Sequence, residues 1–339
     1  MLQTPLTRRR FTRGIAAAGG LLIFSRRATG ADFEMRQYHN QLAESPLHQR
    51  LVEMWAAVKT ETTGRVEVRV FPENNRFQPG QANPLDMLVR GELEFYTTSG
   101  NGLASLVPPA EVQTTPFAFR TREQVFRAID GNIGDYLQAE LRTKGIHAIP
   151  YGCFENGFHQ FTTATRPIRT AADLQGLKLR APGSPAYLDF FRMYGAVTTS
   201  MNITRLYEIL KDGTVEAQED PLDIVELLKL YEVQRYASIT NHSWSGYNLL
   251  ANLKIWERLP SDIRQTIERN ARTFVRLQRD DMERMNTRAR NGLAAHGMIL
   301  NETDTASFRP QLPAFYGRWK QHVGLKAWNL LEGHVGRLG

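Results

Sequence analysis

Five carboxylates cluster in the stretch GTVEAQEDPLDIVE, residues 213–226. The clustered acids are Glu216, Glu219, Asp220, Asp223 and Glu226. Such a group could act as general acid and base, bind a metal ion, line a ligand pocket or face solvent at a turn. Adjacent Glu219 and Asp220 point to opposite sides of an extended backbone, so they suit neither a shared proton nor a joint metal ion. On the residues alone, a solvated turn around Pro221 is favoured.

The other reactive residue types show no spacing that is typical of a metal or nucleophile site. The eight histidines form no HExxH or HxH pattern, and the single cysteine, Cys153, excludes an internal disulfide and a CxxC metal site. The stretch SGNGLAS, residues 99–105, contains GxG but lacks the third glycine and the Lys-Ser/Thr of a phosphate-binding loop. No GxSxG motif occurs. We therefore expect no metal site and no cofactor.

The first part of the chain, up to residue 99, alternates between predicted strands and helices that could position the acids. Residues 33–39, 65–71 and 93–99 have strand patterns, with period-two alternation clearest in RVEVRVF. Residues 45–64 carry apolar side chains at helical spacing, and residues 83–90 predict a further helix before Gly91. This β-α-β-α-β order is the pattern of a mostly parallel sheet.

The second half of the chain predicts another α/β block and a long helix. Residues 145–168 are expected to form two strands with a turn near Asn156 and Gly157, after a helix near 135–143. The α/β block then runs from about residue 158 to 240. Residues 262–295 have apolar residues on one helical face, and at 1.5 Å rise per residue this helix is about 50 Å long, enough to brace two domains.

The N-terminus has the pattern of an export signal. Residues 7–11 (TRRRF) are a twin-arginine motif, residues 14–24 are apolar and Gly/Ala-rich, and residues 28–30 offer small side chains for cleavage. About 11 apolar residues are too few to span a bilayer. We expect residues 1–30 to be a twin-arginine signal peptide, and the mature protein to lie outside the cytoplasm, in the periplasm of a cell with two membranes.

The basic charge of the chain belongs to this leader. The first 30 residues hold six arginines and no acid, so their removal lowers the formal net charge from +7 to +1. Nucleic-acid binding then loses its main support.

Two later segments resemble a known family. RPIRTAADLQGLKLRAPGSPAY (166–187) and VEAQEDPLDIVELLKLYEVQRYASITNH (215–242) are similar to DctP-type solute-binding proteins of tripartite ATP-independent periplasmic (TRAP) transporters. That family commonly has a Gly-Leu-Lys-Ile/Leu-Arg-x-Pro run, then VDGQENP, then Y-E-V-x-K-Y. These appear here at 176–182, 215–221 and 231–236. TGRVEVRVFPEN and PFAFRTREQVF resemble its N-terminal half, so the resemblance covers essentially the whole mature chain.

The resemblance implies a two-domain α/β fold of the type II periplasmic-binding-protein kind. Hinge strands and a long domain-spanning helix join the domains, which close on a small molecule in the cleft. Its first domain would comprise residues 31–156 plus about 246–285, and its second residues 157–245 plus about 286–339.

The implied function is that of an extracytoplasmic solute receptor, not an enzyme. It would bind a small organic acid and deliver it to the small and large membrane subunits of a TRAP permease. Two alternatives stay open: a secreted hydrolase or lyase using Glu219, Asp220 and His159, and a sensory solute-binding protein.

The resemblance also places a carboxylate-binding residue and two departures from the family pattern. Arg180 is the residue that would bind a substrate carboxylate through two parallel charge-assisted hydrogen bonds. His159 stands where many relatives have arginine, and Asp220 stands where asparagine is usual, a change of up to about −2 in pocket charge. A monocarboxylate with a polar or aromatic body is therefore favoured over a plain dicarboxylate. We expect Asp220 to be neutralised by Arg180, by protonated His159 or by a ligand donor.

The remaining candidate ligand contacts are aromatic residues and strand ends. Phe158, Trp244 and Tyr187 could pack against the body of the ligand, with core packing as the alternative. Open α/β sheets bind ligands at the carboxyl ends of their strands. The candidates from such positions are Tyr38, His39, Asn40, Asn75, Thr98 and Ser99, and Ile203 completes the predicted set.

Overall fold

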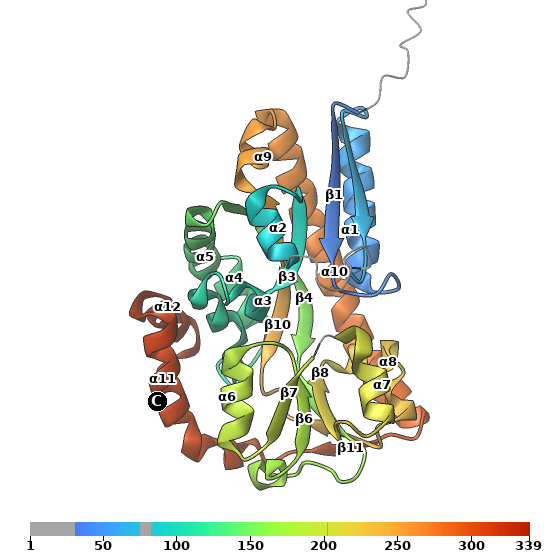
Figure 1. Ribbon diagram of the computed structural model, residues 1–339, viewed down its shortest axis with the longest axis vertical. Helices are drawn as coiled ribbons and strands as arrows, with labels where there is room; N and C mark the ends of the chain where they lie inside the picture. The colour runs from blue at the N-terminus through green and yellow to red at the C-terminus, as the bar shows by residue number, and fades with distance from the viewer. Residues whose placement is uncertain (1–30, 75–82, 202) are drawn as a thin grey trace, which may run out of the picture. The chain divides into compact units, whose positions relative to one another are not determined.

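The computed structural model describes residues 31–74, 83–201 and 203–339 (Figure 1). The predicted signal peptide, residues 1–30, and the candidate Asn75 lie outside this described part. The described residues form two β-sheets with helices packed around them.

The first sheet contains the predicted N-terminal strands. In spatial order its strands are β2 (Val66–Phe71), β1 (Phe33–His39), β3 (Phe95–Ser99), β10 (Trp244–Asn252) and β4 (Ile146–Phe158). β1 pairs in parallel with β2 and β3, which confirms the predicted parallel arrangement. β10 runs antiparallel to both β3 and β4, so a strand from late in the chain lies between two early ones.

The second sheet contains the acid-rich segment. In spatial order its strands are β11 (Ile299–Glu302), β9 (Tyr236–Ile239), β5 (Gln160–Thr163), β8 (Ala217–Asp220), β6 (Lys178–Ala181) and β7 (Val197–Ser200). β6 is parallel to β7 and β8, whereas β5 is antiparallel to β8 and β9.

Two short connections carry the chain between the sheets. β4 ends in the first sheet and β5 begins in the second only two residues later, with His159 between them; β9 and β10 make the return crossing. The predicted turn near Asn156 and Gly157 is wrong, because β4 continues through both residues and Gly157 pairs with Ser245. Gly157 has a φ of 126°, next to a register shift in the pairing, so the Asn-Gly pair accommodates an irregular crossing strand rather than a hairpin.

The helices surround and connect these sheets (Figure 1). They are α1 (Pro46–Glu61), α2 (Pro84–Arg90), α3 (Gly100–Leu103), α4 (Arg122–Ile129), α5 (Asn132–Thr143), α6 (Pro185–Met193), α7 (Leu206–Lys211), α8 (Leu222–Leu227), α9 (Leu253–Arg258), α10 (Ser261–Ala295), α11 (Leu312–Val323) and α12 (Leu325–Val335). A 3-10 segment, η1 (Pro108–Thr114), follows α3. Within the described part, no helix is both long and apolar enough to cross a membrane.

The long helix α10 links the two sheets, as predicted. Its 35 residues contact helix α1 and strand β4 of the first sheet, and helix α8 and strand β11 of the second sheet. Ile263 and Ile267 are buried at one end and Leu293 at the other. Burial of this apolar stripe stabilises α10 against both halves of the molecule. The predicted fold class, two α/β sheets with a domain-spanning helix, is confirmed.

The C-terminal helices return toward the first half of the chain. α11 packs against η1, and α12 packs against α4 and α5. Trp328 on α12 and Phe315 on α11 are fully buried in this packing. These contacts join residues that the sequence assigns to the second domain with elements from 31–156, and the domain boundaries themselves stay a prediction.

Candidate ligand-binding site

A cavity of about 360 Å³ lies between residues of the two sheets. Its volume falls within the usual range for small-molecule sites. Predicted contacts from both halves of the chain meet in its lining: Asn40, Thr98, Ser99, His159, Arg180, Ile203 and Asp220. The strand-end rule therefore places Asn40, after β1, and Ser99, the last residue of β3, at the same cavity.

Strand β6 holds Arg180 at the cavity with only 3% of its surface exposed. Its Nε donates to the carbonyl oxygen of Met201 at 3.0 Å, and its Nη1 donates to Oδ2 of Asp220 at 2.9 Å. A guanidinium carries five N–H donors, so these two bonds fix its plane and leave other donors for a ligand.

Asp220, the last residue of β8, is neutralised by Arg180, one of the three predicted ways. Burial raises the pKa of Asp220, and the positive charge of Arg180 reverses this only in part because Glu219 adds a second negative charge nearby. The pair therefore brings no net positive charge to the cavity while Asp220 is ionised.

His159, between β4 and β5, uses both ring nitrogens. Its Nδ1 lies 2.5 Å from Oε2 of Glu219, and its Nε2 lies 2.8 Å from Oγ of Ser245. Burial lowers the pKa of His159, but the charge of Glu219 and the hydrogen bond to it outweigh burial, so this pKa is raised overall. Although burial alone would raise the pKa of Glu219, the two histidines around it, His159 and His242, lower it. Both shifts favour a charged pair of imidazolium and carboxylate at this buried position.

His242 completes the surroundings of Glu219. Its Nε2 lies 3.3 Å from the same carboxylate oxygen, Oε2, and its Nδ1 lies 2.8 Å from Oγ1 of Thr240. Burial lowers the pKa of His242, which favours the neutral ring that donates from Nε2 to Glu219 and accepts from Thr240.

The solvated turn that the residues alone favoured around Pro221 is wrong, although Asp223 lies in the first turn of α8. Glu219, Asp220 and Asp223 are buried, and only Glu216 and Glu226 are partly exposed. As predicted, Glu219 and Asp220 point apart, the first toward His159 and the second toward Arg180. Charges buried in this way need partners, which the sequence supplies from distant strands.

Three predicted aromatic contacts do not line the cavity. Trp244 is 1% exposed and packs edge-on against Phe126, with ring centroids 6.2 Å apart. Tyr38 stacks on Phe71 at 4.7 Å, and Phe158 pairs across the strands with Trp244 and packs against the hydrophobic core. Trp244 and Phe158 therefore show the core packing that was the alternative for them, and Tyr38 packs against Phe71.

Two further candidates also lie within the protein interior. The Tyr187 hydroxyl is 2.5 Å from Oγ of Ser243, and Nε2 of His39 is 3.0 Å from Nδ1 of His48. Neither Tyr187 nor His39 belongs to the cavity lining.

The sequence reasoning missed several polar residues of the cavity. They are Gln41, Asn83, Asn101, Asn156, Ser200, Ser245 and Tyr247. Ser245 and Tyr247 are two apart on β10, so they face the same side of the strand, and period-two alternation was the signal that could have found them. Asn156 was assigned to the turn that does not exist.

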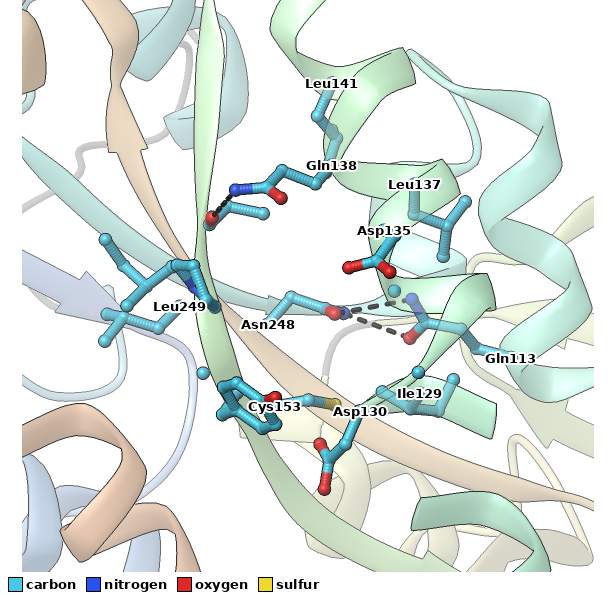
Figure 2. A pocket seen from close by; sticks show the side chains of 17 residues that line it. Gln113, Ile129, Asp130, Asp135, Leu137, Gln138, Leu141, Cys153, Asn248 and Leu249 are labelled. Atoms are coloured by element: carbon cyan, nitrogen blue, oxygen red, sulfur yellow. Dashed lines mark hydrogen bonds between the residues drawn. The ribbon is translucent and has the colours of Figure 1, made fainter. Parts of the chain in front are cut away.

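A second cavity, of about 130 Å³, lies between α5 and β4 (Figure 2). Gln113 and Asn248 are hydrogen bonded to each other across it, and Gln138 donates to the carbonyl oxygen of Ala148 at 3.1 Å. Asp130, on its edge, is held by Arg279 at 2.6 Å. This cavity is smaller than usual ligand sites, and none of the predicted ligand contacts lines it.

Metal binding has no support in the described ranges. Across residues 31–74, 83–201 and 203–339, no three His, Cys, Asp or Glu side chains are grouped so that they could hold a metal ion.

Two α/β sheets joined by crossing strands and a spanning helix, with a polar cavity between them, define a periplasmic binding protein. The family model "Bacterial extracellular solute-binding protein, family 7", named DctP, matches residues 38–322. The chain therefore belongs to the DctP family of periplasmic solute-binding proteins of TRAP transporters, a family of binding proteins rather than enzymes.

Individual relatives agree with this assignment. The 2,3-diketo-L-gulonate-binding periplasmic protein of Escherichia coli K12 is 28% identical over 257 residues, which cover 75% of this chain and 77% of the relative. The C4-dicarboxylate-binding periplasmic protein of Rhodobacter capsulatus is 27% identical over 265 residues, 78% of each chain. A TRAP periplasmic solute-binding protein of Polaromonas sp. JS666, solved with bound D-erythronate, has a TM-score of 0.82 at 24% identity and covers 88% of this chain and 98% of its own.

Proposed function

We propose that this protein is the solute receptor of a TRAP transporter for a small monocarboxylate with a hydroxylated or carbonyl-bearing body. The observation that carries the proposal is Arg180, which is buried at the cavity and keeps N–H donors beyond those used by Met201 and Asp220. A planar guanidinium selects a carboxylate and fixes its orientation.

The charge balance favours one carboxylate over two. The positive charges of Arg180 and His159 are matched by the negative charges of Asp220 and Glu219. A first carboxylate can share Arg180 with Asp220. A second carboxylate would lack a free cation, and an unpaired buried charge costs several kcal/mol.

The polarity of the wall supports a hydroxylated body. On the side of the first sheet the cavity is lined by amide and hydroxyl side chains: Asn40, Gln41, Asn83, Thr98, Ser99 and Asn101. Such groups donate to and accept from ligand hydroxyls. Phe158 and Trp244, which the sequence suggested as contacts for an aromatic body, pack against the core instead. D-Erythronate and 2,3-diketo-L-gulonate, bound by two relatives, are monocarboxylates of the proposed kind.

The cellular context belongs to the same proposal. We infer that residues 1–30 direct export by the twin-arginine route, and that the receptor acts in the periplasm. Ligand that contacts both sheets would stabilise a closed form, and the small and large subunits of the permease would recognise that form.

Isothermal titration calorimetry with a panel of sugar acids, hydroxy acids and dicarboxylates tests this proposal. We expect stoichiometric binding of a hydroxylated monocarboxylate and no product. R180K keeps the charge but loses the planar fork, so we expect a 10- to 100-fold weaker affinity. The control R318K changes an arginine that is half exposed and pairs with Asp189. Failure of every acid in the panel to bind, or equal affinities of R180K and R318K, would refute the proposal.

A further inference from the structure

A chain of hydrogen bonds runs along the crossing strands at the cavity. The Tyr247 hydroxyl donates to Oδ1 of Asn156 at 2.9 Å, and Nδ2 of Asn156 donates to Oγ of Ser245 at 2.9 Å. Ser245 Oγ is hydrogen bonded to Nε2 of His159 at 2.8 Å, and Nδ1 of His159 is hydrogen bonded to Oε2 of Glu219 at 2.5 Å. All five side chains are at least nine-tenths buried, and all except Glu219 line the cavity.

The direction of each bond follows from the donors and acceptors available. Glu219 forms ion pairs with His159 and His242 and, in the described part of the chain, with no arginine or lysine. A buried carboxylate needs a compensating charge. The His159 ring, 2.5 Å away, supplies it when both of its nitrogens carry protons. Its Nε2–H must then donate to Ser245.

The hydroxyl of Ser245 can then only donate its proton to a further acceptor. Its oxygen accepts from Asn156 and from His159, which occupies both of its acceptor positions. Its own proton must point elsewhere, and Ser245 borders the cavity. If His159 were neutral at Nε2, the same proton would instead turn back to that nitrogen.

We propose that charged His159 acts as a positioning residue that orients Ser245 to donate its hydroxyl proton to the ligand. This inference rests on the proposed function and narrows its ligand class. His159 uses both N–H groups on Glu219 and Ser245, so the ligand meets the neutral hydroxyl of Ser245 rather than the charged ring. A neutral hydroxyl donor suits an uncharged ligand oxygen, a hydroxyl or a keto group, better than a second carboxylate.

The charge state of His159 has several determinants besides Glu219. Asp220 raises its pKa and Arg180 lowers it, while the neighbouring His242 is held neutral by burial. Tyr187 faces the His159 ring edge-on with centroids 6.0 Å apart, and burial keeps its hydroxyl protonated. Burial lowers the pKa of His159, but the net shift is upward because of the neighbouring carboxylates, which favours the protonated ring.

The first test uses the purified protein without ligand. Histidine-selective ¹⁵N labelling, with His159 assigned by its absence in H159Q, reports the protonation of each ring nitrogen. We expect both nitrogens of His159 to be protonated at pH 7. A neutral ring at that pH overturns the inference, whatever the protein binds.

The second test measures affinity for D-erythronate and butyrate, which share a carbon chain and differ in hydroxyl groups. We expect S245A to weaken D-erythronate binding about tenfold and to leave butyrate binding unchanged, because only the hydroxylated acid has an acceptor to lose. S245T keeps the hydroxyl and should retain the affinity. Wild-type affinity for D-erythronate should fall once His159 deprotonates, whereas that of S245A should not.

The outcomes separate this inference from the proposed function. If S245A loses affinity equally for both acids, or for neither, the proposed role of Ser245 is overturned. The R180K measurement still tests the carboxylate site in that case. If the panel identifies a different hydroxylated or keto acid, that acid and its deoxy analogue replace the pair. A protein that binds no acid refutes the proposed function, and the ring protonation of His159 then decides the hydrogen-bond chain by itself.

Discussion

Replacing Asp220 with asparagine removes one negative charge from the cavity. The amide oxygen can still accept from Nη1 of Arg180, which now bonds to Asp220 at 2.9 Å. Because the two side chains have nearly the same shape, the change leaves the packing of β8 in place. The variant therefore isolates the electrostatic contribution of Asp220 to ligand selectivity.

The size of the cavity sets the expected effect. A sphere of about 360 Å³ is about 9 Å across, and we take this length as the separation between Asp220 and a second ligand carboxylate. At an effective dielectric constant of about 20, two charges 9 Å apart repel by about 1.8 kcal/mol, a factor of about 20 in affinity. D220N should therefore favour a dicarboxylate over a monocarboxylate by about twentyfold more than the wild type does.

Calorimetric titration with succinate and butyrate measures this ratio directly. Both acids have four carbons and differ in the second carboxylate, so effects on the first carboxylate cancel. E216Q is a matched control, because Glu216 is a partly exposed acid directly before β8 and does not line the cavity. A succinate-to-butyrate ratio that is the same in D220N, E216Q and the wild type would remove Asp220 from the determinants of selectivity.

Three further predictions concern the stability of the folded chain. Burial raises the pKa of Asp223 to about 7, so ionisation of this carboxyl lowers the free energy of unfolding as pH rises from about 4 to 7. We expect D223N to raise the free energy of unfolding by about 1–3 kcal/mol at pH 8 and by less at pH 5. Equal effects at both pH values in thermal unfolding would contradict this argument. Gly157 has a φ of 126°, which suits only glycine, so we expect G157A to lower the free energy of unfolding in urea by about 2–3 kcal/mol. Gly213 has a φ of 75° and open space around it, so G213A should cost only about 1 kcal/mol. Equal costs for the two variants would refute the strain argument. R279M removes the two hydrogen bonds, of 2.6 and 2.8 Å, by which the guanidinium holds Asp130. Since this ion pair is partly exposed, we expect the free energy of unfolding to fall by about 2 kcal/mol. An unchanged unfolding midpoint would contradict this expectation.

The periodic elements could be predicted from the sequence because local physics sets them. The long helix was expected at residues 262–295 and spans Ser261–Ala295, since its apolar stripe is continuous. The crossing at Gly157 could not be predicted in this way. An Asn-Gly pair marks a turn in most contexts, and only pairing with a strand 88 residues later makes it part of β4.

The residues of the candidate site could also be predicted from the sequence only in part. Arg180 and His159 were found through a family pattern, and the structure places both at one cavity. Trp244 packs in the core while its neighbour Ser245 lines the cavity, because neighbouring residues of a strand face opposite sides. The burial of Glu219 depends on His159, 60 residues away, so no local composition could reveal it.

The place of β10 between β3 and β4 also constrains how the chain folds during synthesis. The first sheet cannot close until β10 has left the ribosome, about 85 residues after β4 ends; at about 5–20 residues per second this takes roughly 4–17 s. During that time β3 and β4 each present an unpaired edge that can associate with other chains. The first sheet is therefore completed only after every strand of the second sheet except β11 has been made, and the nascent chain depends on protection of those two edges until β10 arrives.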